Sequence, residues 1–302
     1  MRTFLWFLGL FVFGFAVMAV FAWPLYDALT PSFDVKFHRV ANRLGMLALL
    51  IGMVLLARRL GVADRQSLGY GLARKPFLMT AGWGFIAGVC SLLPVVALMG
   101  LLDLRELKPD LAVNALLLIE LALSGLLSGM AVALIEETFF RGAMHSGIAR
   151  ESGNSAAILL TALLYSAVHF LGSYRIPVEE LGPDSGVRHI VGTFANLLAP
   201  SRIIDAFLAL FSVGVLLGVL RTHSGNIATC LGLHAGWVWI ITFLREGTTH
   251  NTDSQWGFLV SSFDGVVGWL VLAWTIILTL AIRAWLRRGG QLTPQSHPQT
   301  DE

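Results

Sequence analysis

A long apolar run that ends in two adjacent acids is the feature that most constrains this chain. Residues 111–135 contain one carboxylate, Glu120, and no basic residue, and Glu136 and Glu137 follow directly. The run is long enough to cross a bilayer as a helix. An ionisable side chain in or near hydrocarbon is costly unless it is paired, hydrated or neutralised, so the sequence suggests a function for at least one of the two acids.

Composition extends this prediction to the whole chain. Of the 302 residues, 56% are hydrophobic and 13% are charged, whereas a soluble domain carries roughly a quarter charged residues. The apolar runs are long and continuous, unlike the short alternating segments of a membrane β-barrel. We therefore predict an all-α, polytopic membrane helix bundle. No cluster of Lys and Arg resembles a nucleic-acid-binding surface, so nucleic acid is not an expected partner.

About eight spans, each near the length that crosses the hydrocarbon core, account for the apolar runs. The first lacks a following small-residue cleavage site, so we expect a retained helix and not a signal peptide. The long loop at about 173–203 is expected to cap the bundle or to carry a short interfacial segment. The predicted spans are approximately 3–22, 43–57, 77–101, 112–135, 156–172, 204–220, 226–244 and 264–282.

The basic residues predict the topology. The two dense clusters of Lys and Arg, in 58–75 and 283–288, fall on the same side of the membrane. Because cytoplasmic loops carry an excess of Lys and Arg, this side is predicted to be cytoplasmic. We therefore expect a plasma-membrane protein whose two termini both face the cytoplasm. Glu136 then lies at the cytoplasmic end of its span. We expect a single membrane-embedded domain, 1–288, and a disordered cytoplasmic tail, 289–302.

Pairs of glycines four residues apart occur within three of the predicted spans. Such pairs allow two helices to approach closely. We interpret them as packing inside the bundle, and the sequence leaves the oligomeric state open. The pairs are Gly84 with Gly88, Gly125 with Gly129, and Gly214 with Gly218.

The two adjacent acids are not equivalent. Neighbouring residues on a helix point about 100° apart, so only one acid can face a given cavity. Arg141 lies one turn after Glu137 and can pair with it, which leaves Glu136 without a local partner. An unpaired carboxylate in a poorly solvated site suits a general base. In the alternative interpretation, both acids mark the membrane boundary and meet water.

Two histidines, His169 and His234, lie inside later apolar runs. Each alone is more often a core residue than a catalyst, but two of them and a carboxylate on three helices are more informative. Their depth in the membrane matches that of Glu136 only if the fourth helix continues past Glu136. The sequence therefore predicts that residues 138–149 extend this helix.

These motifs resemble those of the CAAX-protease and bacteriocin-processing family of intramembrane proteases, also called Abi. That family shows Glu-Glu-x-x-x-Arg, then aromatic-x-x-x-His, then His-x-x-x-Asn or Asp, on separate helices. The resemblance covers about residues 112–245, the expected catalytic core. In the third motif this chain has Val238 at the position of the polar residue, and Asn226 and Ser224 are the candidate substitutes for it. The matching residues are Glu136, Glu137 and Arg141, then Tyr165 and His169, then His234.

The resemblance implies hydrolysis of a peptide bond in a membrane-associated peptide or protein. Glu136 would activate a water that His169 helps to hold, and His234 would stabilise the oxyanion. Glu137 and Arg141 would form a structural pair. Members are described either as glutamate proteases or as metalloproteases. No cofactor is favoured here; the alternative is Zn²⁺ held by Glu136, His169 and His234.

Two other functions remain open. The same Glu and His residues could form a proton or cation relay in a transporter. A non-catalytic membrane scaffold or immunity protein could keep the fold with an impaired site, which the departure at Val238 would fit. Eukaryotic members of the family remove three residues after a prenylated Cys, but the sequence names no substrate.

Overall fold

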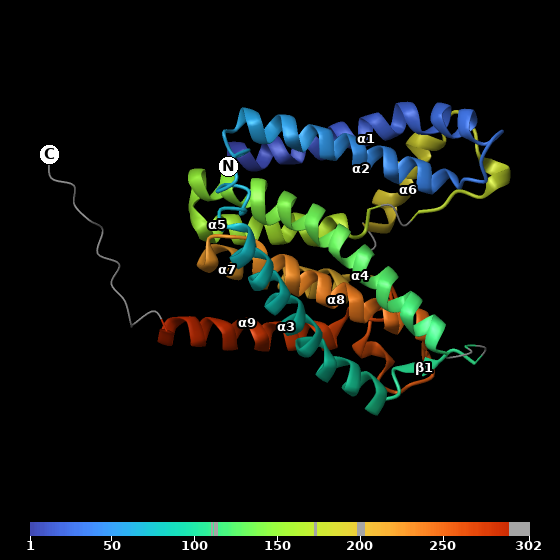
Figure 1. Ribbon diagram of the computed structural model, residues 1–302. Coiled ribbons are helices and arrows are strands. Elements are labelled where there is room, and N and C mark those ends of the chain that lie inside the picture. Colours follow the sequence, from blue (N-terminus) through green and yellow to red (C-terminus); the bar gives the residue numbers. More distant parts are fainter. Residues whose placement is uncertain (110, 112–113, 172–173, 198–202, 290–302) are drawn as a thin grey trace, which may run out of the picture.

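The computed structural model describes residues 1–109, 111, 114–171, 174–197 and 203–289. Figure 1 shows a bundle of long helices in which α1 and α2 form a layer on one side, while α3 and α9 lie on the other. The helices are α1 (Arg2–Leu29), α2 (Phe37–Arg59), α3 (Arg74–Leu101), α4 (Ala115–Glu137), α5 (His145–Val168), α6 (Ser185–Leu197), α7 (Ile204–Ser224), α8 (Ala228–Gly247) and α9 (Trp269–Gly289).

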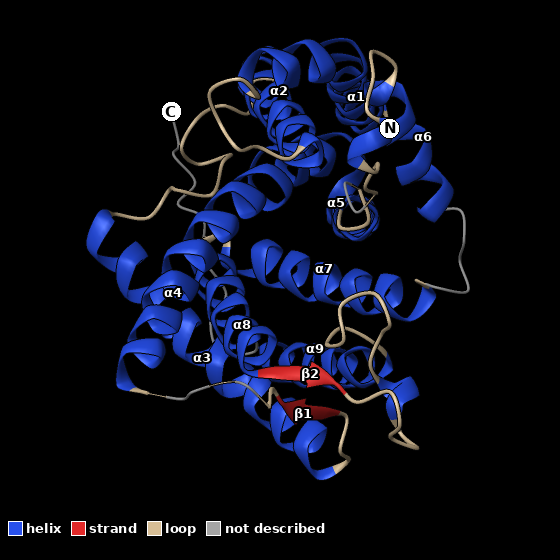
Figure 2. Cartoon of the chain, turned by 90° about the vertical axis from the view of Figure 1, so that its right-hand side faces the viewer, coloured by secondary structure: helices blue, strands red, loops and turns tan. Residues whose placement is uncertain are grey.

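Short elements connect these helices. A π-helical segment, η1 (Thr138–Met144), joins α4 to α5, and the chain also forms the short 3₁₀ turns η2 (Val178–Glu180) and η4 (Gly257–Leu259). Strand β1 (Arg105–Leu107) pairs antiparallel with β2 (Thr248–His250), which ties the end of α3 to the end of α8. Figure 2 shows α7 between α5 and α9, and α8 packs against both α3 and α4.

The predicted polytopic helix bundle is confirmed. Among the described residues, 7 helical stretches are long and apolar enough to cross a membrane. One of them, Ala115–Val168, is 54 residues long and covers most of the fourth and fifth predicted spans. Helical backbone does continue past Glu136, as the depth of the histidines required. It is interrupted at Gly153, whose φ of 83° and ψ of 166° are not helical.

Some predicted spans were too short. Helix α2 begins at Phe37 and not at 43, and α1 ends at Leu29 and not at 22. Helix α5 starts at His145, but its part after Gly153 begins close to the predicted 156. Hydropathy marks where hydrocarbon ends, but a helix continues into the polar interface as long as its backbone stays hydrogen-bonded. The loop at 173–203 carries a short helix, α6, which packs on α1. The predicted tail begins with the last residue of α9, and 290–302 lie outside the described residues.

All three glycine pairs lie at close helix contacts, as predicted. Gly125 and Gly129 face α8, while Gly214 and Gly218 face α5. On α3, a Cβ at Gly84 would lie 2.7 Å from the carbonyl oxygen of Thr229 on α8. A Cβ at Gly88 would fall on the carbonyl oxygen of Leu233, next to His234. The α3–α8 contact therefore helps to fix the position of His234.

We expect Gly88→Ala to lower the free energy of unfolding by about 1–3 kcal/mol, because the added methyl group meets backbone atoms that cannot turn away. Gly82→Ala is the matched control on the same helix, since a Cβ there has no neighbour within 4 Å. Thermal unfolding of both variants in detergent tests this. Equal midpoints for the two variants would contradict the close α3–α8 contact.

Candidate active site

Glu137 is the centre of a buried polar network. Its Oε1 atom lies 3.3 Å from Nη1 of Arg141, and both side chains are 0% exposed. The same oxygen lies 2.8 Å from Nδ1 of His234, on α8. Arg141 also donates to the carbonyl of Gly214, on α7, and its guanidinium lies 4.3 Å from the centre of the Tyr165 ring. The predicted Glu137–Arg141 pair is therefore present, and it connects α4 to α5, α7 and α8.

Residues from other segments hydrogen bond to the π-helical turn after Glu137. Arg221 is buried on α7 and donates from Nε to the carbonyl oxygen of Arg141, at 2.8 Å. The Tyr70 hydroxyl, from the connection between α2 and α3, lies 2.6 Å from Oγ1 of Thr138. Wide turns of this kind are frequent at functional sites. These contacts fix the segment on which Arg141 lies, so Arg221 is a positioning residue that the sequence analysis missed.

Glu136 faces His169 and not the buried network. Its Oε2 atom lies 4.0 Å from Nε2 of His169, and the two side chains are 26% and 27% exposed. Nδ1 of His169 lies 2.7 Å from the carbonyl oxygen of Tyr165. Since a carbonyl only accepts hydrogen bonds, Nδ1 carries the proton. In the neutral ring, Nε2 then offers a lone pair on the side of Glu136.

Tyr165 packs against both histidines. Its buried ring lies 4.5 Å from the ring of His169 and 6.3 Å from that of His234, measured between centroids. The same ring contacts Arg141 and the ring of Phe140. The six residues predicted from the sequence motifs are thus brought together, and Tyr165 connects the Glu136–His169 pair with the Glu137 network.

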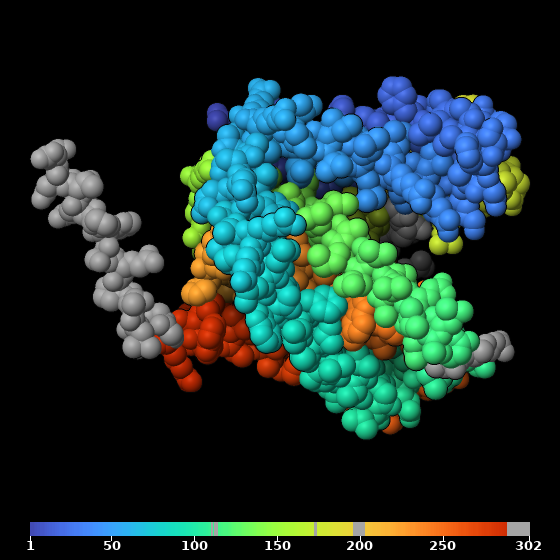
Figure 3. Space-filling view, in the orientation of Figure 1, coloured from blue at the N-terminus to red at the C-terminus, as the bar shows by residue number. Residues whose placement is uncertain are grey.

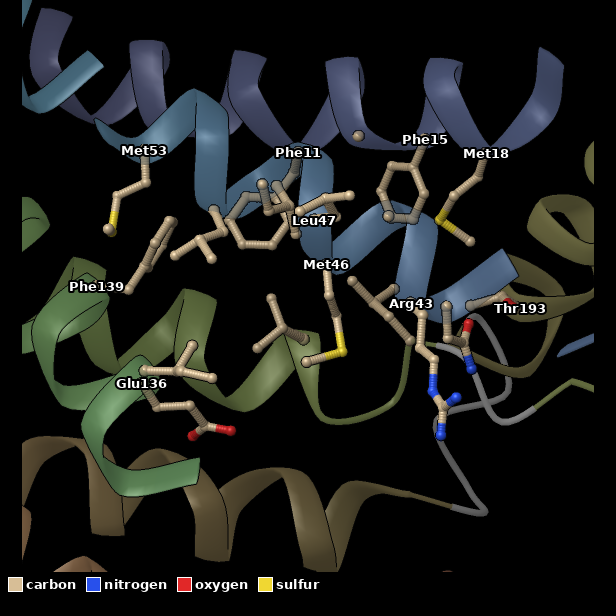
Figure 4. Close-up of a pocket in the computed structure, with 18 of the residues that line it drawn as sticks. Phe11, Phe15, Met18, Arg43, Met46, Leu47, Met53, Glu136, Phe139 and Thr193 are labelled. Carbon is tan, nitrogen blue, oxygen red and sulfur yellow. The ribbon is translucent and has the colours of Figure 1, made fainter. Parts of the chain in front are cut away.

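A cavity of about 570 Å³ opens beside Glu136. Its walls come from α1, α2, η1, α6 and the ends of α4 and α5, and they are largely apolar. Figure 4 shows Glu136 across from side chains of α1 and α2, such as Phe11 and Met46, with Arg43 at the far end. Among the described lining residues, Glu136 is the only acid and Arg43 the only Lys or Arg. Figure 3 shows the surface hollowed between α2 and α4.

The suggested substitutes for a polar residue at 238 do not reach the site. Asn226 and Ser224 hydrogen bond to each other's backbone in the turn before α8, and Asn226 Oδ1 accepts from the backbone N–H of Ala228. They lie at least two turns before His234 in the sequence, and their hydrogen bonds are used within this turn. Val238 instead packs towards Gly129 on α4, where an added Cβ would lie 3.4 Å from that of Val238. The partner of His234 is Glu137.

No group of three His, Cys, Asp or Glu side chains in the described part of the chain is placed to hold one metal ion. In the alternative zinc site, Glu136 and His169 face each other, and His234 is bound to Glu137 through Nδ1, which leaves its Nε2 available as a ligand. The chemistry below is derived for the side chains alone.

The comparisons with known proteins bear on the same segment. Residues 118–240 match a family model described as Type II CAAX prenyl endopeptidase Rce1-like. The resemblance to the CAAX-protease and bacteriocin-processing family is therefore confirmed. The Rce1-like segment contains all six motif residues and supports an intramembrane protease-like function for this integral membrane protein. It does not contain α1 and α2, which supply much of the cavity wall. Searches of curated proteins and of solved structures found no match.

Proposed function

We propose that this protein is an endopeptidase that cleaves a membrane-associated peptide or protein with a water activated by Glu136. The observation that carries the proposal is the facing pair of Glu136 Oε2 and His169 Nε2, 4.0 Å apart beside an apolar cavity. Two polar atoms at this separation can both hydrogen bond one water that lies beside the line joining them. Such a water would be held by two proton acceptors, one of which can act as the general base that hydrolysis needs.

In the proposed reaction, Glu136 takes a proton from this water as its oxygen attacks the carbonyl carbon. The same proton then passes to the leaving amine, so that the carboxylate is regenerated. His169 holds the water through Nε2, because its Nδ1–H is committed to the carbonyl of Tyr165. General-base assistance of this kind contributes about 10²–10⁴-fold.

His234 is proposed to stabilise the oxyanion. Its Nδ1–H is donated to the Glu137 carboxylate. When Nε2 is protonated as well, the ring is an imidazolium paired with this buried anion. Its Nε2–H can then donate to the developing negative charge. Arg141 and Arg221 keep Glu137 in place and act through it.

The cavity is proposed to admit substrate from the lipid. It lies between α2 and α4. Met46 and Leu50 of α2 and Ile135 of α4 line the cavity, and these three side chains are also exposed on the surface. An apolar peptide segment can therefore reach Glu136 without crossing a polar surface. We further propose that both termini face the cytoplasm of a cell whose plasma membrane contains the protein, as the basic clusters predict.

The proposal is tested by mapping the carboxyl termini of membrane proteins by mass spectrometry. Membranes that contain the wild-type protein are compared with membranes that contain His169→Ala at equal abundance. We expect a set of new carboxyl termini in the wild-type sample and at least a tenfold loss of them in the variant, because the water loses one of its two holders. A third sample receives a zinc chelator, and we expect no loss of cleavage there.

The other possible outcomes distinguish the alternative functions. Identical termini in all samples contradict protease activity and favour the scaffold function. Identical termini combined with a proton flux into proteoliposomes that depends on His169 favour the relay. Loss of cleavage on chelation, restored by Zn²⁺, contradicts the metal-free mechanism while leaving the protease function in place.

A further inference from the structure

A second cavity, of about 590 Å³, lies away from the proposed active site. It is formed between α5, α7 and α9 at the end of the bundle where the N-terminus and the end of α9 lie (Figure 1). Its walls combine an apolar part with a polar part. The apolar residues are Ile158, Leu159, Val215, Val219 and Leu286, and the polar residues are Ser155, Thr222, His223, Arg283 and Arg287.

The polar part of this cavity is basic. Arg283 and Arg287 lie one turn apart on α9, so both guanidinium groups can reach one ligand. His223 joins them from the last turn of α7. Among the described residues that line the cavity there is no Asp or Glu. The cavity therefore carries at least two fixed positive charges that no lining acid neutralises.

The flanking residues place this basic part at the membrane surface. Trp285, between the two arginines in sequence, is 71% exposed, and exposed Trp is enriched at the interface between hydrocarbon and water. Ser155 lies just after the interruption at Gly153, so it belongs to the first turn of the second part of α5. The positive end of that helical part points to the same side. Apart from Leu286 on α9, the apolar residues lie on α5 and α7.

From this arrangement we infer that the cavity binds one anionic phospholipid. The phosphate lies on Arg283 and Arg287, and one acyl chain lies along Ile158 and Val219. Basic cavities between membrane helices on the cytoplasmic side suit this class of ligand. A soluble anion would meet the two arginines but would leave the apolar half of the cavity unused, so a lipid matches both halves. The inference does not depend on the proposed protease reaction.

The test uses the purified full-length protein in detergent, with lipid added at defined ratios. Native mass spectrometry counts bound dioleoyl phosphatidylglycerol, with dioleoyl phosphatidylcholine as the neutral reference. We expect phosphatidylglycerol to be retained in preference, and Arg283→Gln/Arg287→Gln to weaken its binding roughly tenfold or more. Arg283→Lys/Arg287→Lys keeps both charges and should retain most of the binding.

Arg58→Gln/Arg65→Gln is the matched control, because it removes two exposed arginines from the same basic side but outside the cavity. We expect this control to bind lipid as the wild type does. Equal retention of the two lipids by the wild type, or equal losses in the two Gln variants, would overturn the inference. A third arm adds inorganic phosphate alone; if phosphate displaces the lipid at equal concentration, the site is one for soluble anions and the lipid assignment is wrong. Circular dichroism confirms that each variant is folded.

Discussion

Replacing Glu136 with Gln is expected to lower the rate of peptide cleavage by about 10²–10⁴-fold while the protein remains folded and inserted. The amide has the shape of the carboxylate but cannot take a proton from water. Since Glu136 makes no hydrogen bond to the buried Glu137 network, and its side chain is partly exposed, the substitution should leave stability nearly unchanged. The measurement is the cleavage rate of a substrate identified from the mapped termini, in proteoliposomes.

Glu120→Gln is the control for this experiment. Glu120 is an exposed carboxylate on the same helix, α4, and it lies more than four turns before Glu136. The two variants remove the same charge from the same helix, so an effect of helix charge alone would appear in both. Cleavage at the wild-type rate by Glu136→Gln would rule out Glu136 as the base. Equal slowing of both variants would show that the loss is not specific to the site.

Local spacing predicted part of the site correctly. The interval of four residues between Glu137 and Arg141 predicted their ion pair, because residues one helical turn apart are neighbours whatever the rest of the fold does. The depth of His169 and His234 predicted that the helix continues past Glu136. In both cases the prediction needed only the regular geometry of a helix and the thickness of a membrane.

The remaining features depend on contacts between distant segments. The hydrogen bond between His234 and Glu137 joins residues 97 positions apart. No local pattern shows whether His234 binds Glu136 or Glu137. The π-helical form of η1 is accompanied by the bond from Arg221 to the carbonyl of Arg141, 80 positions away. The cavity wall from α1 and α2 was likewise missed, since these helices carry no motif and their side chains look like ordinary lipid-facing residues.

The buried network makes Arg141 the residue whose loss should cost the most stability. Arg141→Gln leaves the Glu137 carboxylate fully buried without the guanidinium, and removing one partner of a buried ion pair costs about 3–5 kcal/mol. His234 still donates to Glu137, which should keep the loss within this range. We expect the midpoint of thermal unfolding in detergent to fall by at least about 5 °C.

Two further variants separate the buried charge from a general effect of removing an arginine. Arg188→Gln breaks an exposed ion pair with Glu180 and should cost about 1 kcal/mol or less. Glu137→Gln/Arg141→Gln removes both buried charges, so its loss should be smaller than the sum of the two single losses, because no uncompensated charge remains. If the double variant loses as much as that sum, the two side chains are not coupled. The role proposed for Arg141 in holding Glu137 would then have to be given up.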